Sequence, residues 1–321
     1  MTLTVAQRWK LAHPKYWLIW FGFALWYGSS LLSYTWQCWL GRRLGGCLYR
    51  FQGRRRQIAA ANIAMCLPDL SAREQHALVR QVMNSTGIAF FETGMAWFWP
   101  AWRLDRSYTV EGLEHLDAAK RDGVGVILIA FHFTHIDIGA KLLGRSVCID
   151  GTYRPHNNPV FDLVQRWGRE RLTQNGQTIP RAAVRTMIKA LRQGRFVWYS
   201  PDQDYGPKHS IFVPLFGIEA ATVTATSELA RLGKARVIPF TQTRKADGSG
   251  YHIQVRAPLE NFPSGDAVAD AIHINRVVEA SIKEQPEQYL WLHRRFKTRP
   301  EGAPDLYQQH GVAPKHRTTR R

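Results

Sequence analysis

This sequence has no closely spaced pair of cysteines and no internal repeat, and its acidic residues are few. The chain of 321 residues has 4 cysteines and no C-x-x-C pair, so we interpret the cysteines as packing residues. Its 25 Asp and Glu are outnumbered by 43 Lys and Arg, which gives a formal net charge of +18. This excess predicts an anionic partner: nucleic acid, a phosphorylated ligand, an acidic carrier protein or an anionic membrane surface. A hydrophobic content of 45% is enough for one large domain or two small ones.

A stretch without charged residues covers residues 16–41. It is longer than the roughly 20 helical residues that cross a ~30 Å hydrocarbon core, so we expect a single membrane helix here. A monotopic anchor that lies in the membrane interface is the alternative. A cleaved signal peptide fits less well, because the stretch is too long and no A-x-A-like site follows it. The basic N-terminal segment, residues 1–15, carries fewer cations than residues 42–56, so the positive-inside rule places the main domain in the cytoplasm.

A helical collar is expected over residues 42–106. Its first helix should end at Pro68, where the chain can no longer continue the helical hydrogen bonds. Ser71 and Glu74 form a capping box that opens a second long helix, which runs to about Phe98.

An α/β domain is expected over residues 107–308. Four apolar strand candidates, separated by helical stretches, predict a mostly parallel central sheet flanked by helices. These candidates are residues 125–131, 146–153, 195–200 and 235–240. Residues 245–251 should form a turn between two antiparallel edge strands, and a helix should follow near 266–285. Residues 309–321 have few apolar side chains and are expected to form a basic, disordered tail.

The stretch "LIAFHFTHIDIG" at residues 128–139 places His132 at the end of the strongest strand candidate. In open α/β sheets this edge binds ligands. Asp137 can reach His132 if a helix starts between them, with Thr134 as its N-cap. The pair would fix the imidazole tautomer and make the other ring nitrogen a base for a substrate hydroxyl. Because no G-x-S-x-G elbow is present, the nucleophile can be an acceptor alcohol that attacks an acyl thioester, which is O-acyl transfer.

Two other interpretations of this stretch stay open. Thr134 and Asp137 also resemble a capping box, in which Asp137 would only stabilise the start of the helix. A metal site formed by His132, His135 and Asp137 is the second alternative, but no further ligand cluster with suitable spacing accompanies these residues.

The sequence "HFTHID" resembles the H-x-x-x-x-D box of the glycerolipid acyltransferase superfamily. Its setting at residues 123–144 is similar to that in the late, or secondary, lipid A acyltransferases of Gram-negative bacteria. Three further stretches carry the same resemblance: "TYRPHNNPVFD", "VWYSPDQDYGPKHSIFVPLFG" and "EQYLWLHRRFKTRPEG". The likeness extends from the anchor to about Tyr307 and is strongest to the lauroyltransferase branch. The box varies between Asp and Glu in this family, and this chain has the shorter Asp.

The resemblance implies transfer of a fatty acyl chain, lauroyl or similar, from acyl carrier protein. The acceptor would be a 3-hydroxyacyl hydroxyl of lipid IV-A, usually already carrying Kdo sugars, at the cytoplasmic face of the inner membrane. His132 and Asp137 would be catalytic. Anionic inner-membrane lipid would be a further partner, and no nucleic acid, metal or organic cofactor is implied.

Substrate contacts are expected from six further residues, each with an ordinary structural alternative. Arg154 suits an acceptor phosphate or an acyl carbonyl, but it could also form a surface ion pair. Asp202, Gln203 and Asp204 correspond to the third box of the superfamily, although turn formation equally explains an Asp-rich stretch. Arg169 and Arg171 are placed near the acceptor, and a charged helix face is their alternative.

Two rival functions share parts of this pattern. A phospholipid acyltransferase with a lysophosphatidate-type acceptor would use the same box. A non-catalytic membrane-tethered binding protein would need Asp137 only as a helix cap.

Overall fold

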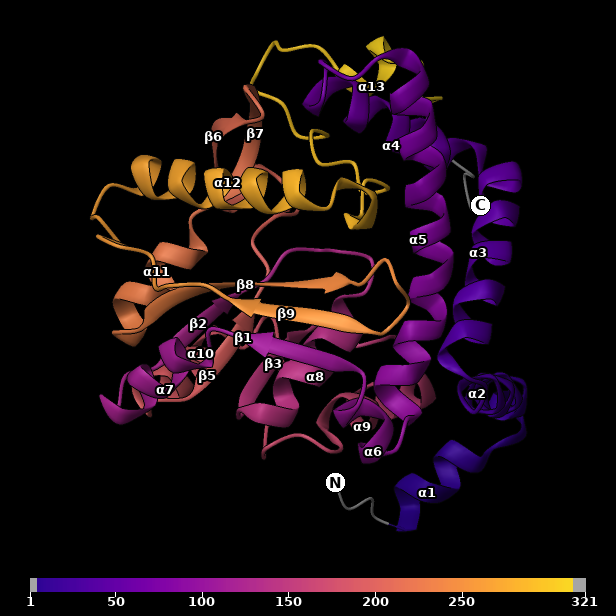
Figure 1. Ribbon diagram of the computed structural model, residues 1–321. Helices are drawn as coiled ribbons and strands as arrows, with labels where there is room; N and C mark the ends of the chain where they lie inside the picture. Colours follow the sequence, from indigo (N-terminus) through magenta and orange to yellow (C-terminus); the bar gives the residue numbers. More distant parts are fainter. Residues whose placement is uncertain (1–4, 314–321) are drawn as a thin grey trace.

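The computed structural model describes residues 5–313, with side chains from Trp9 onward, and arranges helices around a central sheet (Figure 1). The helices are α1 (Val5–Ala12), α2 (Trp17–Ser30), α3 (Tyr34–Phe51), α4 (Gly53–Cys66), α5 (Ala72–Phe98), α6 (Ala101–Asp105), α7 (Leu113–Arg121), α8 (Ile136–Ser146), α9 (Pro159–Glu170), α10 (Val184–Arg192), α11 (Ala225–Gly233), α12 (Ala267–Glu284) and α13 (Leu306–Gln309). The strands are β1 (Tyr108–Glu111), β2 (Val126–Ile129), β3 (Ile149–Tyr153), β4 (Thr178–Pro180), β5 (Phe196–Tyr199), β6 (Ser210–Leu215), β7 (Ile218–Val223), β8 (Arg236–Arg244) and β9 (Tyr251–Val255).

The central sheet has seven strands in the order β1-β9-β8-β2-β5-β3-β4. Its neighbouring strands pair in parallel except for β8 and β9, which form the expected antiparallel hairpin. The expectation that these two are edge strands is wrong, because β9 also pairs with β1 and β8 also pairs with β2. The prediction of a mostly parallel α/β sheet flanked by helices is therefore confirmed. A separate antiparallel pair, β6 and β7, packs against α12 and was not expected from the sequence.

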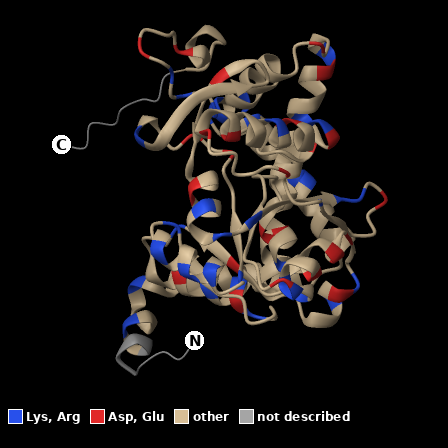
Figure 2. Cartoon of the chain, turned by 90° about the vertical axis from the view of Figure 1, so that its left-hand side faces the viewer, with Lys and Arg blue, Asp and Glu red and all other residues tan. Residues whose placement is uncertain are grey.

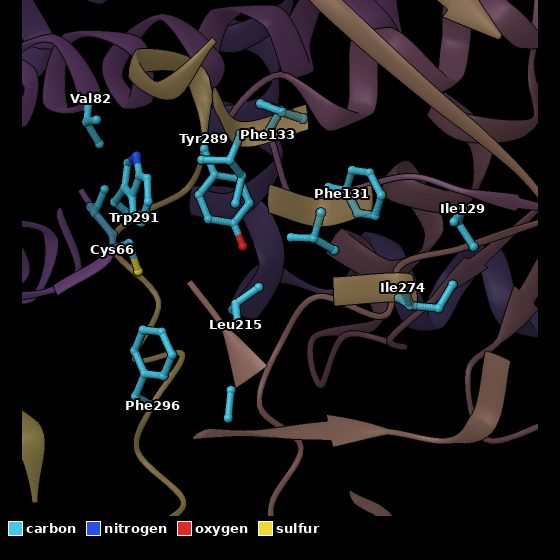
Figure 3. Packing of buried hydrophobic residues seen from close by; sticks show 14 of the residues in the cluster. Cys66, Val82, Ile129, Phe131, Phe133, Leu215, Ile274, Tyr289, Trp291 and Phe296 are labelled. Carbon is cyan, nitrogen blue, oxygen red and sulfur yellow. The ribbon is translucent and has the colours of Figure 1, made fainter. Parts of the chain in front are cut away.

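One hydrophobic core lies on each face of the sheet, because successive residues of a strand point to opposite faces. Core A contains Ile127 and Ile129 of β2 together with side chains of α10, α11 and α12. Core B contains Val126 and Leu128 together with side chains of α8 and α9. Figure 3 shows part of core A, where Phe133, Tyr289 and Trp291 pack together next to α5.

The prediction of one continuous helix over residues 16–41 is wrong. The stretch forms α2 and the first part of α3, with a break at residues 31–33. Carbonyl groups freed at the end of α2 are satisfied by side chains, as helix ends require. Arg103 donates to the carbonyls of residues 30, 31 and 32, and Trp99 and Gln37 also donate to Ser30. Among the helices of residues 5–313, none is both long and apolar enough to cross a membrane.

The collar contains the two helices that the sequence predicts. Helix α4 ends at Cys66, before Pro68, and α5 begins with the Ser71–Glu74 capping box and ends at Phe98. Helix α3 runs across the expected boundary at residue 42 and lies along α5 (Figure 1). The two helices approach closely at Gly45, where a Cβ atom would lie 2.5 Å from the Cα atom of Asn84.

The expected tail of residues 309–321 is described only as far as residue 313. In this part Val312 is buried, and Arg54 of α4 donates to the carbonyl of Ala313 at 3.2 Å. Residues 314–321, like residues 1–4 of the basic N-terminal segment, lie outside the described residues.

Candidate active site

Parallel pairing of β2 with β5 brings His132 next to Asp202. Ile129 of β2 is opposite Tyr199 of β5 in this register. His132 lies three residues after Ile129, and Asp202 lies three residues after Tyr199. The carboxyl ends of adjacent parallel strands meet at the same edge, so the loops that follow them lie side by side. Residues 202–204 therefore lie at the same sheet edge as His132.

Asp202 holds His132 through two hydrogen bonds. The backbone N–H of His132 donates to Oδ2 at 2.8 Å, and Nδ1 lies 2.6 Å from Oδ1. The hydroxyl of Tyr289 donates to Oδ2 at 3.1 Å. Burial alone would raise the pKa of the Asp202 carboxyl, but the facing His132 and its hydrogen bonds lower that pKa below its ordinary value. Asp202 is therefore an ionised carboxylate at neutral pH.

The ionised state of Asp202 decides the tautomer of His132. A carboxylate can only accept hydrogen bonds, so Nδ1 of His132 must carry the proton that is shared with Oδ1. In the neutral imidazole the proton-free nitrogen is then Nε2. The side chain of His132 is 24% exposed, whereas that of Asp202 is fully buried. The buried carboxylate of Asp202 thus holds His132 so that its proton-free Nε2 has a fixed position.

The expected pairing of His132 with Asp137 is not formed. Helix α8 does start between the two residues, but its N-cap is His135 and not Thr134. Oδ1 of Asp137 instead accepts a hydrogen bond from Nε of Arg169 at 2.8 Å. The Thr134 hydroxyl, which both a helix cap and a capping box would use, contacts the hydroxyl of Ser85 at 2.7 Å. Asp137 follows His132 closely in sequence, but the first turn of α8 points its carboxylate toward α9.

His135 lies in the protein core. Its Nε2 is 3.0 Å from the carbonyl of Gln242, and its ring stacks on Tyr251. Burial lowers the pKa of His135 to about 4, so the ring is neutral at physiological pH. The alternative of a metal site with His132, His135 and Asp137 is therefore not supported by the position of His135. Within residues 5–313 no cluster of three potential metal ligands is found.

A cavity of about 970 Å³ opens beside His132. Both His132 and Asp137 line it, together with residues from α8, α9, α10 and α11. This volume lies near the upper end of the ~300–1,000 Å³ that ligand pockets usually have. The cavity is consequently large enough to hold the reacting parts of sizeable substrates next to the free nitrogen of His132.

The other expected contact residues divide into two groups. Arg154, Arg169 and Gln203 line the cavity. Asp204 instead stabilises the loop behind it: its carboxylate accepts hydrogen bonds from the backbone N–H groups of Gly206 and Thr298. Arg171 also lies outside the cavity wall, because its guanidinium donates to the carbonyls of Trp97 and Trp99 and ties α9 to the end of α5. Asp202, Asp204 and Arg171 thus lie outside the lining of the cavity, and Asp202 holds His132 instead.

Three residues of the site were missed by sequence reasoning. Tyr289 supports Asp202, as described above. Nε2 of His293 accepts the backbone N–H of Asp204 at 3.2 Å, and burial lowers the pKa of His293 to about 4. Lys141 lines the cavity and donates to the carbonyls of Arg169 and Arg171, and burial lowers its pKa to about 7. Tyr289 and His293 come from the segment "EQYLWLHRRF", whose aromatic content was a signal for packing against the site.

Comparisons with known proteins identify relatives of the chain. Residues 5–298 match the family of bacterial lipid A biosynthesis acyltransferases. The chain is 44% identical to the lipid A biosynthesis lauroyltransferase of Escherichia coli strain K12, over 92% of this chain and 97% of the relative. It is 42% identical to the palmitoleoyltransferase of the same strain, over 93% of this chain and 97% of the relative. A 1-acyl-sn-glycerophosphate acyltransferase from Thermotoga maritima has 13% identity and a TM-score of 0.37, covering 79% of this chain and 98% of that structure, which is too low to indicate a shared function.

Proposed function

The chain belongs to the family of bacterial lipid A biosynthesis acyltransferases, and we propose that it transfers a fatty acyl chain from an acyl carrier protein to a hydroxyl of a phosphorylated lipid A precursor. The observation that carries this proposal is the His132–Asp202 pair, in which His132 lines a large cavity. The acceptor hydroxyl belongs to a 3-hydroxyacyl chain of (Kdo)2-lipid IV-A. Similarity does not decide the donor chain, since relatives with lauroyl and palmitoleoyl in their names are almost equally identical to this chain.

His132 acts as the general base in this reaction. Its Nε2 removes the proton of the acceptor hydroxyl while the hydroxyl oxygen attacks the carbonyl carbon of the donor thioester. When the tetrahedral intermediate collapses, the carbon–sulfur bond breaks and the departing thiolate takes the proton from His132. Acyl ester and free thiol are the products, and no protein nucleophile or redox partner is needed.

Asp202 supports this proton transfer without contacting substrate. It fixes the tautomer that leaves Nε2 free, and its negative charge stabilises the imidazolium that forms during attack. We assign a different role to Asp137, which lines the cavity as an ion pair with Arg169. This pair, together with Arg154, orients polar groups of the acceptor toward His132.

The charge of the chain fits both proposed substrates. Figure 2 shows Lys and Arg on many elements of the molecule, not only at one end. An acidic carrier protein and a phosphorylated lipid each gain from this positive field. Relatives with more than 40% identity are named as enzymes of lipid A biosynthesis. This favours a lipid A precursor as the acceptor over the lysophosphatidate-type alternative.

The N-terminal helices provide a membrane contact in this proposal. Large apolar side chains on α2, on the break that follows it and on the start of α3 are exposed. Those most exposed are Trp17, Leu18, Phe21, Leu25, Leu31 and Trp36. Arg42 and Arg43 follow them in α3, and the Arg43 guanidinium lies over the Trp39 ring. Exposed aromatic and aliphatic side chains beside cations are typical of monotopic attachment to an anionic bilayer. We therefore place the enzyme on the cytoplasmic side of the bacterial inner membrane.

Mass spectrometry of lipid A tests the proposed function. The lipid would be compared between cells with and without the gene, complemented by the wild type or by His132→Ala. We expect loss of one acyl mass without the gene and its return with the wild type alone. Unchanged lipid A in a strain that lacks related acyltransferases would contradict the proposal.

A further inference from the structure

The cavity beside His132 reaches both faces of the central sheet. Neighbouring residues of a strand point to opposite faces, yet Gly151 and Thr152 of β3 both line it, as do Trp198 and Tyr199 of β5. The two cores show the same division, because Trp198 belongs to core B and Tyr199 packs against core A. The cavity therefore bends over the carboxyl ends of β3 and β5 and has an arm on each face.

The first arm, here called the α9 arm, lies between the sheet and helices α8 and α9. Ile136, Ala140 and Gly144 line it from one face of α8, because residues four apart lie on the same side of a helix. Gly151 is opposite Trp198 in the β3–β5 register. A Cβ atom at Gly151 would meet no atom of the described chain within 4 Å, so this glycine leaves the arm open.

The second arm, here called the α11 arm, lies between the sheet and helices α10 and α11. Met187 of α10 and Leu229 and Leu232 of α11 line it with apolar side chains. Helix α11 ends at Gly233, and β8 starts at Arg236 at the opposite edge of the sheet from His132. Leu232 is consequently farther from His132 along this arm than Leu229.

The two arms differ in their surroundings. Trp97 lines the cavity and packs against Trp26 of α2, with ring centroids 5.2 Å apart, which places the α9 arm on the side of the exposed N-terminal helices. The Asp137–Arg169 ion pair adds polar groups to this arm. Helix α10, which forms a wall of the α11 arm, has three basic residues and no acidic residue. The α9 arm is thus on the side of the proposed membrane contact, and α10 gives the α11 arm a surface complementary to an acidic carrier protein.

The geometry points to two acyl chains bound at once on opposite faces of the sheet, with the donor chain in the α11 arm and the 3-hydroxyacyl chain of the acceptor in the α9 arm. This inference rests on the proposed function and adds the location of each substrate chain. The carrier thioester and the acceptor hydroxyl then meet at the bend of the cavity, beside Nε2 of His132. Donor length is set by the depth of the α11 arm, where Leu232 lies.

Two substitutions test the roles of the two arms independently. Leu232→Trp shortens the α11 arm at a half-buried position, and Gly151→Leu fills the α9 arm from a strand position whose φ angle is suitable for any L-residue. The purified full-length variants would be assayed with decanoyl, dodecanoyl, tetradecanoyl and hexadecanoyl carrier protein, each at varied concentrations of the lipid A precursor. Thermal melting would show that each variant is folded, and Gly151→Ala is the smaller substitution if Gly151→Leu fails to fold.

We expect Leu232→Trp to move the donor optimum to a shorter chain, with kcat/KM falling about fourfold for each excluded methylene. Gly151→Leu should keep the donor optimum and raise the KM for the acceptor. An exchange of these effects, or impairment of the same substrate by both variants, would overturn the inference. If the wild type transfers no acyl chain to the precursor from any donor, the proposed function itself fails, which is a distinguishable result.

Discussion

Nδ1 of His132 lies 2.6 Å from Oδ1 of Asp202, and the backbone N–H of the same histidine donates to the other carboxylate oxygen. Both oxygens of one buried carboxylate are thus used to hold one residue. Backbone and side chain of His132 are fixed together, which leaves Nε2 free in a constant position. Activity in this account depends on the His132–Asp202 pair more than on the pairing of residues within the H-x-x-x-x-D box.

Removal of the Tyr289 hydroxyl should weaken the support of Asp202 without abolishing it. Tyr289→Phe keeps the ring contact with Phe133, at 5.7 Å between centroids, and removes the hydrogen bond to Oδ2. A hydrogen bond to a charged group contributes about 1.5–3 kcal/mol, so we expect kcat to fall by roughly tenfold or more with little change in KM. Steady-state kinetics would measure both values, and an unchanged kcat would show that Asp202 does not need this donor.

Replacement of Gly45 and of Gly46 in α3 by alanine should have different effects on the free energy of unfolding. Gly45→Ala places a Cβ atom against the backbone of α5, which we expect to lower the free energy of unfolding by roughly 1–3 kcal/mol. Gly46→Ala is the matched control, because a Cβ there meets no atom of the described chain within 4 Å and alanine favours a helix by up to about 1 kcal/mol. Urea denaturation of the purified proteins compares them, and equal effects would contradict the close α3–α5 packing.

Folding stability should fall in acid because of His135. Burial lowers its pKa from 6.5 to about 4, so the unfolded chain binds a proton in a pH range in which the folded protein does not. Stability is then lost as the pH falls from about 6.5 toward 4, by roughly 3 kcal/mol for a shift of this size. His135→Gln should show a flatter dependence of the free energy of unfolding over this range. The same slope in variant and wild type would exclude His135 as the cause.

Exposed apolar side chains of α2 should control membrane binding. Leu18 is 80% exposed and Phe21 is 59% exposed. The double variant Leu18→Glu and Phe21→Glu should bind vesicles that contain anionic lipid at least about tenfold more weakly, because each side chain contributes more than 1 kcal/mol on burial. Val268→Glu, at a 50% exposed site on α12, provides the control. Vesicle flotation measures binding, and an equal loss in both proteins would contradict a specific attachment through α2.

Sequence patterns predict the parts of this molecule that depend on local chemistry. The apolar strands, the capping box at Ser71 and the position of His132 at a sheet edge follow from residues close in the chain. The partner of His132 could not be predicted in this way, since Asp202 lies 70 residues away and only the β2–β5 register brings it near. Asp137 was the local candidate, and Arg169 from another helix binds it instead.

Long-range contacts also explain the error at the N-terminus. Hydropathy treats residues 16–41 as one segment, but the break after Ser30 depends on donors from Trp99 and Arg103. The cavity beside His132 is equally non-local, because its wall combines residues from five helices and three strands of the main sheet.

A kinetic comparison of Asp202→Asn with Asp137→Asn tests the central claim most directly. Purified variants would be assayed with acyl carrier protein thioester and lipid A precursor, after thermal melting has shown that both are folded. Asparagine at residue 202 removes the charge and can donate to the histidine, which disturbs the tautomer, so we predict a loss of kcat on the order of 1,000-fold. Asparagine at residue 137 breaks the pair with Arg169 and should mainly raise the KM for the acceptor. Near-normal turnover by Asp202→Asn, together with inactivity of Asp137→Asn, would contradict the account.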